Sequence, residues 1–439
     1  MVNFAQQPKY EAYKDSGVKS IGKIPVDWQV KKLKFCTSIN ANTLADNTSA
    51  KLVIEYVDIG SVSLENGIVN TEQFIFSEAP SRARRLAKAG DTVVSTVRTY
   101  LKAISYVNEE HANYVFSTGF AILSPKKDVN AKYLSNFIKS NSFTDQVDDV
   151  AKGMSYPAIN STELSGLYIV AQSLLEQTLI ASFLDQKTAQ IDAAIAIKKQ
   201  QIELLKERKQ IIIQQAVTQG LDPNVPMKDS GVEWIGQIPE HWEVKRAKYL
   251  FNEIDERSKT GDEELLSVSH MTGVTPRSEK SVTMIAEDYT GSKTCQKNDF
   301  IINIMWAWMG AMGVSDRPGI VSSAYSIFRQ TPLGIFNPIY LEWLLTTVGY
   351  IEHYNQVSTG LHSSRLRFYS RMFFDMEIGF PDRNEQDEIV KAVKNQSTKV
   401  EQAVLLNMQQ IQKLKEYKTT LINSAVTGKI KITPELLTK

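Results

Sequence analysis

The side chains best suited to chemistry in this chain are two groups of basic residues mixed with hydroxyl and aromatic groups. The first, residues 82–102 (RARRLAKAGDTVVSTVRTYLK), has six basic residues and one acid, Asp91. The second, residues 358–371 (STGLHSSRLRFYSR), has three arginines, one histidine and no acid. Arginine can form paired hydrogen bonds with guanine edges, lysine and hydroxyl groups suit phosphate oxygens, and aromatic rings can stack on bases. Both groups therefore indicate contact with DNA.

The first half also contains a counterpart of the second group, residues 151–161 (AKGMSYPAINS). A single run of positive charge is more often a solvated face, and Trp306 and Trp308 are more typical of core or turn anchors than of base contacts. The candidate DNA-contacting residues are drawn from these segments, with two further basic residues of the second half. They are Arg82, Arg84, Arg85, Arg98, Tyr100, Lys102, Lys152, Ser155, Tyr156, Arg277, Lys293, His362, Ser363, Ser364, Arg365 and Arg367.

No motif typical of an enzyme is present in the sequence. It has no Walker loop, no GxGxxG after a strand, no HExxH and no GxSxG. The five histidines lack metal-ligand spacing, and Cys36 and Cys295 form no CxxC pair, so we predict no catalytic and no metal site. Residues 337–340 (NPIY) are similar to a loop of amino-methyltransferases, but the second proline is missing, which favours a helix-entry turn.

The bulk composition is that of an ordinary globular protein. The 439 residues, 42% of them hydrophobic, are enough for two or three domains. The net charge of +1 indicates neither nucleic acid nor membrane, so a DNA contact must rest on local patches. The polar N-terminus has no signal-peptide core, and the most apolar run, residues 300–314, is too short to cross a bilayer. We therefore expect a cytoplasmic protein.

Two long helices must position these residues. Residues 176–219 contain no glycine and no proline. Their apolar positions step by four and three, as in a heptad seam. Shifted by 209, the pattern returns over residues 385–428. A helix of about 40 residues is roughly 60 Å long, and its apolar stripe needs a partner helix. The predicted seam consists of Ile191, Ile195, Ile202, Leu205, Ile212, Val400, Val404, Ile411, Leu414 and Leu421.

A second repeat opens each half of the chain. Residues 14–34 (KDSGVKSIGKIPVDWQVKKLK) return as residues 228–248 (KDSGVEWIGQIPEHWEVKRAK), at an offset of 214. Glycine and proline at these spacings indicate turns, and Trp28 and Trp242 suit an anchoring role against an apolar surface. Between these opening repeats and the helices, strand-like and helix-like runs alternate and have diverged. Each half is therefore a mixed α/β globule followed by a long helix.

The order of the repeats predicts how the helices pair. The opening repeat at residue 228 follows the first helix after only eight residues, so it lies at the C-terminal end of that helix. Equivalent docking places the opening repeat at residue 14 at the C-terminal end of the second helix. The start of the first helix then meets the end of the second. We expect an antiparallel coiled coil with pseudo-two-fold symmetry and one globule at each end.

This organisation resembles the specificity (S) subunits of type I restriction–modification systems. The resemblance rests on the twice-repeated KDSG…IG.IP..W.VK motif and on the twice-repeated EQ…QQI..LKE.K…AVT helix, and it covers nearly the whole chain. It implies two tandem target recognition domains, residues 1–172 and 222–382. A first conserved helix over 173–221 and a second helix with a C-terminal tail over 383–439 would form the spacer.

The resemblance also implies a function and partners. Each recognition domain would read one half of a bipartite, asymmetric site in double-stranded DNA, and the helices would set the half-site spacing. The chain itself would have no catalytic activity and no cofactor. It would bind two modification subunits, which carry S-adenosylmethionine, and through them restriction subunits that use ATP and Mg.

Three other functions remain open at this point. The chain could be a coiled-coil structural adaptor without DNA recognition, which sequence-specific methylation dependent on it would exclude. It could be a methyltransferase acting alone, in which case the isolated protein should bind S-adenosylmethionine. It could also belong to a modification-only system, because the restriction subunit is a separate chain.

Overall fold

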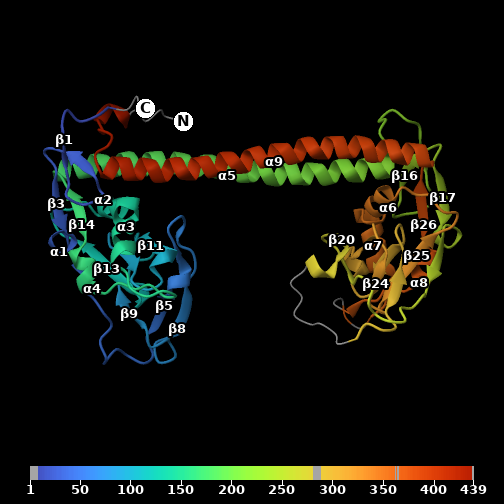
Figure 1. The fold of residues 1–439 in the computed structure, drawn as a ribbon, viewed down its shortest axis with the longest axis horizontal. Coiled ribbons are helices and arrows are strands. Elements are labelled where there is room, and N and C mark those ends of the chain that lie inside the picture. Colours follow the sequence, from blue (N-terminus) through green and yellow to red (C-terminus); the bar gives the residue numbers. More distant parts are fainter. Residues whose placement is uncertain (1–7, 280–287, 361, 363–364, 438–439) are drawn as a thin grey trace. The chain divides into compact units, whose positions relative to one another are not determined.

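The computed structural model describes residues 8–279, 288–360, 362 and 365–437 (Figure 1). The chain divides into two compact units, each with its own mixed α/β globule. Unit 1 comprises Met1–Lys199 and Met408–Lys439, and unit 2 comprises Gln200–Asn407. Each unit thus contains a globule and a segment of each long helix, α5 (Leu174–Gln219) and α9 (Arg383–Val426). The predicted fold class, with two tandem α/β globules each followed by a long helix, is confirmed.

The globule of unit 1 is built on two four-stranded sheets, in the orders β11-β10-β13-β4 and β8-β5-β12-β9. Its strands are β1 (Tyr13–Asp15), β2 (Lys23–Pro25), β3 (Gln29–Lys32), β4 (Thr37–Ile39), β5 (Val53–Val57), β6 (Val62–Ser63), β7 (Gly67–Ile68), β8 (Glu72–Ile75), β9 (Ala83–Leu86), β10 (Thr92–Ser95), β11 (Ile104–Tyr106), β12 (Val115–Ser117), β13 (Phe120–Pro125) and β14 (Tyr168–Ala171). Its short helices are α1 (Leu33–Cys36), α2 (Ala131–Lys139), α3 (Asn141–Val150) and α4 (Ser161–Gly166).

The globule of unit 2 has one four-stranded sheet, in the order β18-β25-β22-β23, and several two-stranded ones. Its strands are β15 (Met227–Asp229), β16 (Gln237–Pro239), β17 (Glu243–Arg246), β18 (Phe251–Ile254), β19 (Leu266–Ser269), β20 (Gly273–Pro276), β21 (Lys293–Cys295), β22 (Phe300–Asn303), β23 (Met312–Val314), β24 (Gly319–Val321), β25 (Tyr325–Gln330) and β26 (Glu377–Phe380). Its short helices are α6 (Pro338–Leu345), α7 (Val348–Val357) and α8 (Ser370–Asp375).

Both opening repeats fold into the same hairpin. β1 pairs with β2 and β15 pairs with β16, in the same register. The aspartate of each KDSG motif accepts a hydrogen bond from the glycine N–H, at 2.8 Å for Asp15 and 2.9 Å for Asp229. This local bond turns the chain after the first strand. The motif recurs because it encodes a turn.

The Glu-Gln pair at the start of each long helix holds the globule to the helix. In unit 1, Glu176 accepts a hydrogen bond from the Trp28 indole at 3.3 Å, and Gln177 accepts one from the main-chain N–H of Asn130 at 2.8 Å. In unit 2, Glu385 accepts from the Trp242 indole at 3.1 Å, and Gln386 accepts from the N–H of Asn337 at 2.8 Å. Both tryptophans are buried. The two units therefore use the same anchor.

Contacts inside each unit show that the helices run antiparallel. In unit 1, the Asp192 carboxylate lies 2.7 Å from the Lys418 amine. Glu176 and Gly428, at the two ends of that segment, both lie against Trp28. The predicted antiparallel pairing is thus confirmed within unit 1.

Unit 2 repeats this arrangement at equivalent positions. The Lys209 amine lies 2.7 Å from Glu401, and Gly220 lies against Glu385. Lys209 and Glu401 each stand 209 positions from the residues of the unit 1 ion pair, so the internal repeat is preserved at the level of contacts.

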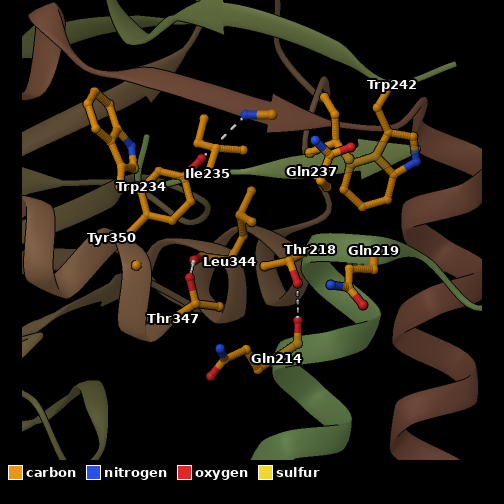
Figure 2. Close-up of a pocket in the computed structure, with 13 residues that line it drawn as sticks. Gln214, Thr218, Gln219, Trp234, Ile235, Gln237, Trp242, Leu344, Thr347 and Tyr350 are labelled. Atoms are coloured by element: carbon orange, nitrogen blue, oxygen red, sulfur yellow. Dashed lines mark hydrogen bonds between the residues drawn. The ribbon is translucent and has the colours of Figure 1, made fainter. Parts of the chain in front are cut away.

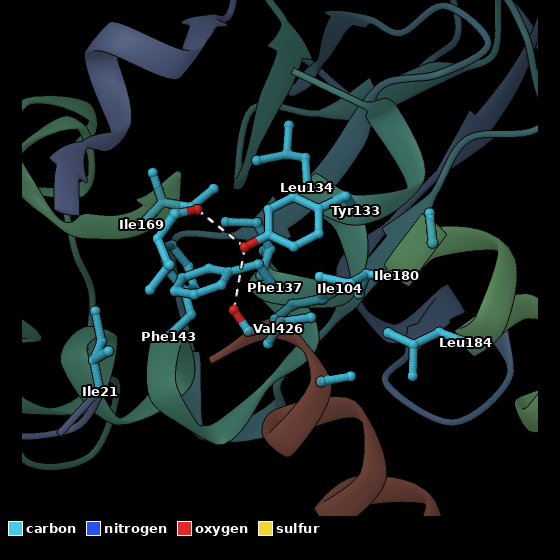
Figure 3. Close-up of a cluster of buried hydrophobic side chains, with 14 of the residues drawn as sticks. Ile21, Ile104, Tyr133, Leu134, Phe137, Phe143, Ile169, Ile180, Leu184 and Val426 are labelled. Atoms are coloured by element: carbon cyan, nitrogen blue, oxygen red, sulfur yellow. Dashed lines mark hydrogen bonds between the residues drawn. The ribbon is translucent and has the colours of Figure 1, made fainter. Parts of the chain in front are cut away.

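The seam positions carry the apolar contacts between the helices. Ile191, Ile195, Ile202 and Leu421 are buried, and the other six predicted seam residues are half-buried. In unit 1, the seam continues into the core formed by α2 and α3, where the Tyr133 ring packs near Val426 (Figure 3). None of the helices in the described ranges combines the length and the apolar character that a membrane crossing requires.

In unit 2, the corresponding junction of helix and globule encloses a cavity of about 220 Å³ (Figure 2). Thr218 of α5, Trp234 and Gln237 of the opening repeat, Leu344 of α6 and Tyr350 of α7 point toward it. None of the described residues that line it carries a charge.

Candidate nucleic-acid interface

In unit 1, two surface loops are joined by main-chain hydrogen bonds. The loop after β10, residues 96–102, meets the loop after α3, residues 152–158, and we call them the unit 1 paired loops. Ile159 N–H donates to the Thr96 carbonyl at 2.8 Å, and Thr99 N–H donates to the Pro157 carbonyl at 3.3 Å. Lys152 and Ala158 exchange two hydrogen bonds of 2.9 Å, which close the second loop. Main-chain bonds thus fix the positions of both loops.

The paired loops bring a cation and two aromatic rings to the surface. The Arg98 guanidinium lies over the Tyr156 ring, 5.3 Å from its centroid. Tyr156 is 66% exposed and Tyr100 is 55% exposed, so the rings present open faces. Arg98 has φ +52°, a left-handed conformation that is uncommon for a residue other than glycine. A cation stacked on an exposed ring suits contact with nucleobases and phosphate.

The other candidates of these loops have different surroundings. Ser155 is exposed. The exposed Lys152 amine lies 2.9 Å from Glu163, an ion pair at the rim of the loop. The Lys102 amine turns toward α3, where it is 3.3 Å from the Thr144 hydroxyl and 3.9 Å from Asp148. Lys102 is therefore engaged inside the globule.

The arginines around β9 point to three different environments. Arg82 is exposed and lies next to the paired loops. Its carbonyl accepts a hydrogen bond from Thr118 N–H, and the carbonyl of Gly119, which follows Thr118, accepts one from Thr96 N–H of the first loop. Arg84 is the extra residue of a β-bulge, and its guanidinium lies 4.8 Å from the Phe76 ring centroid. The Arg85 Nε is buried and has no hydrogen-bond partner among the described residues.

Unit 2 has the same pair of loops, residues 304–310 and the described residues of 359–367 (359, 360, 362 and 365–367), which we call the unit 2 paired loops. Phe368 N–H donates to the Ile304 carbonyl at 3.0 Å, the counterpart of the bond from Ile159 to Thr96. Thr359 and Arg367 exchange hydrogen bonds of 3.1 and 2.9 Å, the counterparts of those between Lys152 and Ala158. The backbone frame is thus common to both units.

A glycine is required at the same place in each second loop. A Cβ on Gly153 would lie 2.9 Å from the Tyr156 carbonyl oxygen, and a Cβ on Gly360 would lie 2.5 Å from the Arg365 carbonyl oxygen. Each loop folds back closely on its own backbone, which only glycine permits without a shift. The two glycines mark equivalent loops whose other residues differ.

The side chains of the unit 2 paired loops differ from those of unit 1. His362 and Arg365 are exposed, Arg367 is half-buried, and Arg365 N–H donates to the His362 carbonyl at 2.9 Å. Ser363 and Ser364 lie outside the described residues.

Trp306 on the first of these loops is 47% exposed and stacks with Trp308 at 6.1 Å between centroids. The residue types favoured a core or turn role for this pair. The internal repeat could have indicated a surface position for Trp306. Residues 90–91 (GD) and 298–299 (ND) match at an offset of 208, and the same offset aligns Trp306 with Arg98.

Arg277 and Lys293 lie in the β19–β24 region of unit 2 rather than on its paired loops. Arg277 opens a 3₁₀ turn (Arg277–Glu279) after β20, and its N–H donates to the Leu265 carbonyl at 2.8 Å. The Lys293 side chain is only 9% exposed, and its amine lies 3.4 Å from Asp255. A buried lysine with a carboxylate partner has little capacity left for a phosphate group.

Comparison with known sequences identifies type I restriction specificity subunits among the relatives of this chain. Residues 25–207 match the family described as type I restriction modification DNA specificity domain. The chain is 22% identical over 220 residues to the type I restriction enzyme StySPI specificity subunit of Salmonella potsdam, covering 48% of this chain and 47% of that one. It is 27% identical over 241 residues to the MjaIX specificity subunit of Methanocaldococcus jannaschii, covering 52% of each. The matches thus span about half the length of these relatives.

Comparison with solved structures extends the likeness to nearly the whole fold. A chain from a study of complex assembly and conformational transition of the type I R-M system aligns with a TM-score of 0.65 and 17% identity, covering 92% of this chain and 98% of that one. The HsdS subunit from Thermoanaerobacter tengcongensis aligns with a TM-score of 0.53 and 18% identity, covering 93% and 98%. With the doubled opening repeat and the doubled long helix, these likenesses show that this chain has the fold of these solved chains and that its residues 25–207 are similar to the type I restriction modification DNA specificity domain.

Proposed function

We propose that this chain is the DNA-recognition subunit of a type I restriction–modification complex, and that each set of paired loops reads one half of a bipartite site. The observation that carries the proposal is a shared frame with different side chains. Equivalent main-chain bonds hold both pairs of loops, yet unit 1 presents Arg98 and Tyr156 where unit 2 presents Trp306 and Arg365. Two different readers predict an asymmetric site.

The division into two readers has an energetic advantage. Each mismatched base pair costs about 1–3 kcal/mol, and separate positions add roughly independently. Arg98 and Arg365 suit paired hydrogen bonds to guanine, while Tyr156 and Trp306 suit stacking or apolar contacts with thymine methyl groups. Arg82 and Lys152 at the rim suit phosphate contacts, which position the reader without selecting a sequence.

The paired helices would set the distance between the half-sites. α5 has 46 residues and would be roughly 70 Å long at 1.5 Å per residue. A stiff spacer of this kind excludes wrong spacings and loses little conformational entropy on binding. The ion pairs of Lys209 and Lys418 would fix the register of the two helices.

We further propose that catalysis lies in partner subunits. Two modification subunits would supply S-adenosylmethionine-dependent methylation of adenine, and restriction subunits would supply ATP- and Mg-dependent cleavage. The net charge of +1 fits an assembly in which the partners provide much of the phosphate contact. The same features fit a modification-only complex.

The proposal is tested by mapping methylated adenines in cells that carry the modification subunit and variants of this chain. Arg98→Ala with Tyr156→Ala should relax or abolish recognition of one half-site, with a loss of about 1–3 kcal/mol for each base contact removed. Arg365→Ala with Arg367→Ala should affect only the other half-site.

The matched control is Arg371→Ala, because the Arg371 side chain is 93% exposed outside the paired loops. It should leave both half-sites unchanged. Equal loss at both half-sites with either double variant would contradict the proposal. Methylation that is the same with and without this chain would instead support a structural adaptor.

A further inference from the structure

Unit 1 contains a cavity of about 660 Å³ that is separate from the paired loops. Residues of the β6–β7 hairpin, β11, α2, α5 and α9 line it. Its lining includes five lysines and only three carboxylates. The lysines are Lys132, Lys139, Lys199, Lys415 and Lys418. The lining therefore carries a net positive charge of two, before any contribution from His111.

Three of these lysines already have carboxylate partners. Lys132 lies 2.5 Å from Asp185, and Lys415 lies 3.0 Å from Glu65. Lys418 lies 2.7 Å from Asp192. These pairs use all three acids of the lining. No carboxylate of the lining is left to pair with the remaining lysines, so an anion that enters the cavity can pair with them.

Lys139, at the C-terminal end of α2, is such a lysine. Within the described part of the chain, its amine makes no hydrogen bond and no ion pair, although it faces Lys418, Asp185 and Asp192. Burial, and to a lesser degree the charge of Lys418, lowers the pKa of Lys139 to about 8. A negative group beside it would remove this penalty.

Ser135 lies one helical turn before Lys139 and lines the same cavity. It is 4% exposed, and its Oγ has no hydrogen-bond partner among the described residues. A buried hydroxyl without a partner costs free energy. α2 thus presents an unused donor and an unpaired amine to one space.

Unit 2 shows which group occupies the equivalent position there. Asn130 and Asn337 cap α2 and α6 in the same way, so position 135 corresponds to position 342. Position 342 is Glu342, whose carboxylate accepts a hydrogen bond from Val314 N–H on β23 at 2.8 Å. Unit 2 therefore places a negative group between α6 and the edge of β23.

The corresponding donor in unit 1 has the same orientation. Position 106 of β11 corresponds to Val314 of β23. Ala103 and Val107, on either side of β11, form hydrogen bonds toward β10. Ser95 N–H donates to the Ala103 carbonyl, and Val107 N–H donates to the Asp91 carbonyl, both at 2.9 Å. Because alternate residues of an antiparallel strand bond to opposite sides, the N–H of Tyr106 faces away from β10, as does the N–H of Val314 that bonds Glu342 in unit 2. Tyr106 also lines the cavity.

We propose that this cavity binds a small dianionic oxyanion of the phosphate class, inorganic phosphate or a phosphate monoester. Its oxygens occupy the place that the Glu342 carboxylate fills in unit 2. They accept hydrogen bonds from Ser135 and Tyr106 N–H and pair with Lys139. The bound anion also comes close to Lys418 of α9, so it joins the globule of unit 1 to the helix segments of the same unit.

The test is titration of the full chain with sodium phosphate and with adenosine 5′-monophosphate at constant ionic strength, followed by calorimetry and by thermal unfolding. Both probes should bind and raise the unfolding temperature, since a ligand of the folded state stabilises it, whereas sodium chloride should not. Similar affinities identify inorganic phosphate as the fitting source. At least tenfold tighter binding of the nucleotide identifies a phosphate monoester.

Two variants and one control decide the assignment. Lys139→Met should weaken binding at least tenfold. Ser135→Glu supplies the carboxylate that unit 2 already has, so it should fold as stably as the parent protein and bind neither probe. Lys127→Met, a change of an exposed lysine outside the cavity, should bind as the parent does. Absence of binding to the parent protein, or unchanged binding to a folded Ser135→Glu variant, would overturn the proposal.

Discussion

The Tyr133 hydroxyl donates a hydrogen bond to the main-chain oxygen of Val426 at 3.1 Å, across 293 positions of sequence (Figure 3). It also lies 3.0 Å from the Val170 oxygen. In unit 2, the Tyr340 hydroxyl donates to the Val217 oxygen at 3.0 Å. Carbonyls in the last turn of a helix have no partner within the helix. A buried tyrosine in each globule therefore satisfies the end of the long helix that docks there.

We predict that Tyr133→Phe lowers the free energy of unfolding of unit 1 by about 1–3 kcal/mol, because buried carbonyls lose their donor while the ring remains. Tyr340→Phe should have a similar effect on unit 2, since its hydroxyl likewise donates its one proton to a carbonyl at the end of a long helix. Urea unfolding followed by circular dichroism measures both. Tyr369→Phe, at a half-exposed ring, is the control, and a loss as large as that of Tyr133→Phe would contradict the argument.

The ion pairs across the helices lead to a second prediction. Lys418→Asp places two carboxylates side by side, and Asp192→Lys places two amines there. Each single change should lower stability by about 0.5–1 kcal/mol, because like charges at a partly exposed site repel by roughly the amount that opposite charges attract. The double exchange, Lys418→Asp with Asp192→Lys, should recover most of the loss.

Thermal unfolding of the four proteins forms a double-mutant cycle that isolates the pairwise energy. The same cycle at Lys209 and Glu401 provides the matched comparison, because that pair is equivalent in the repeat. Additive effects of the single changes would show that neither pair contributes to helix pairing. Salt at 1 M should reduce both coupling energies.

The repeats made the architecture predictable. Heptad spacing in two copies indicated the long helices, and the place of the second opening repeat indicated their antiparallel order. Both signals are local in sequence. The role of the Glu-Gln pair was hidden, because Glu176 bonds Trp28 and Gln177 bonds Asn130, and such long-range partners leave no pattern in the residues themselves.

The surface was harder to predict than the fold. A basic segment does not reveal which side chain a β-bulge redirects, as at Arg84, or which amine meets a carboxylate from a distant strand, as Lys293 meets Asp255. Residue type likewise favoured a core or turn role for Trp306, which lies in a turn and is 47% exposed. The cavity beside Ser135 depends on the short side chain at this position. This is noticed only when Ser135 is compared with Glu342, its equivalent in the repeat.

A third prediction concerns the spacer. One heptad inserted into both helices, at opposed positions, keeps the seam in phase and adds about 10 Å, or roughly three base pairs of DNA at 3.4 Å each. The half-sites that are read should stay the same, and the permitted spacing should increase. Methylation mapping measures both.

A four-residue insertion in both helices adds about one turn, or roughly 6 Å, and should change the spacing by about two base pairs. It also shifts the seam out of phase, so it should lower the unfolding temperature more than the heptad insertion does. Unaltered spacing with both insertions, in folded proteins, would rule out the helices as the spacer.

The last prediction concerns pH and rests on His353 in α7. Its ring stacks on Trp234 with 3.6 Å between centroids and 19° between planes, and the side chain is 7% exposed. Burial lowers the pKa of His353 below its ordinary value. At a pH between the lowered pKa of the folded state and the ordinary pKa of the unfolded state, the unfolded chain binds a proton that the folded chain does not. Stability therefore falls as the pH decreases below about 6.5.

We predict that His353→Gln removes this dependence. In the parent protein, the buried histidine should contribute a loss of up to about 1.4 kcal/mol per pH unit on acidification below about pH 6.5, until its folded-state pKa is reached. The variant should be less stable at pH 8, because it loses the stacking on Trp234, and its stability should fall less steeply between pH 6.5 and 5. His270→Gln, at an exposed histidine, should keep the parental slope. Urea unfolding of unit 2, followed by tryptophan fluorescence at each pH, gives the pH dependence of stability for the three proteins. Parallel curves for the parent and His353→Gln would assign the acid sensitivity to other groups.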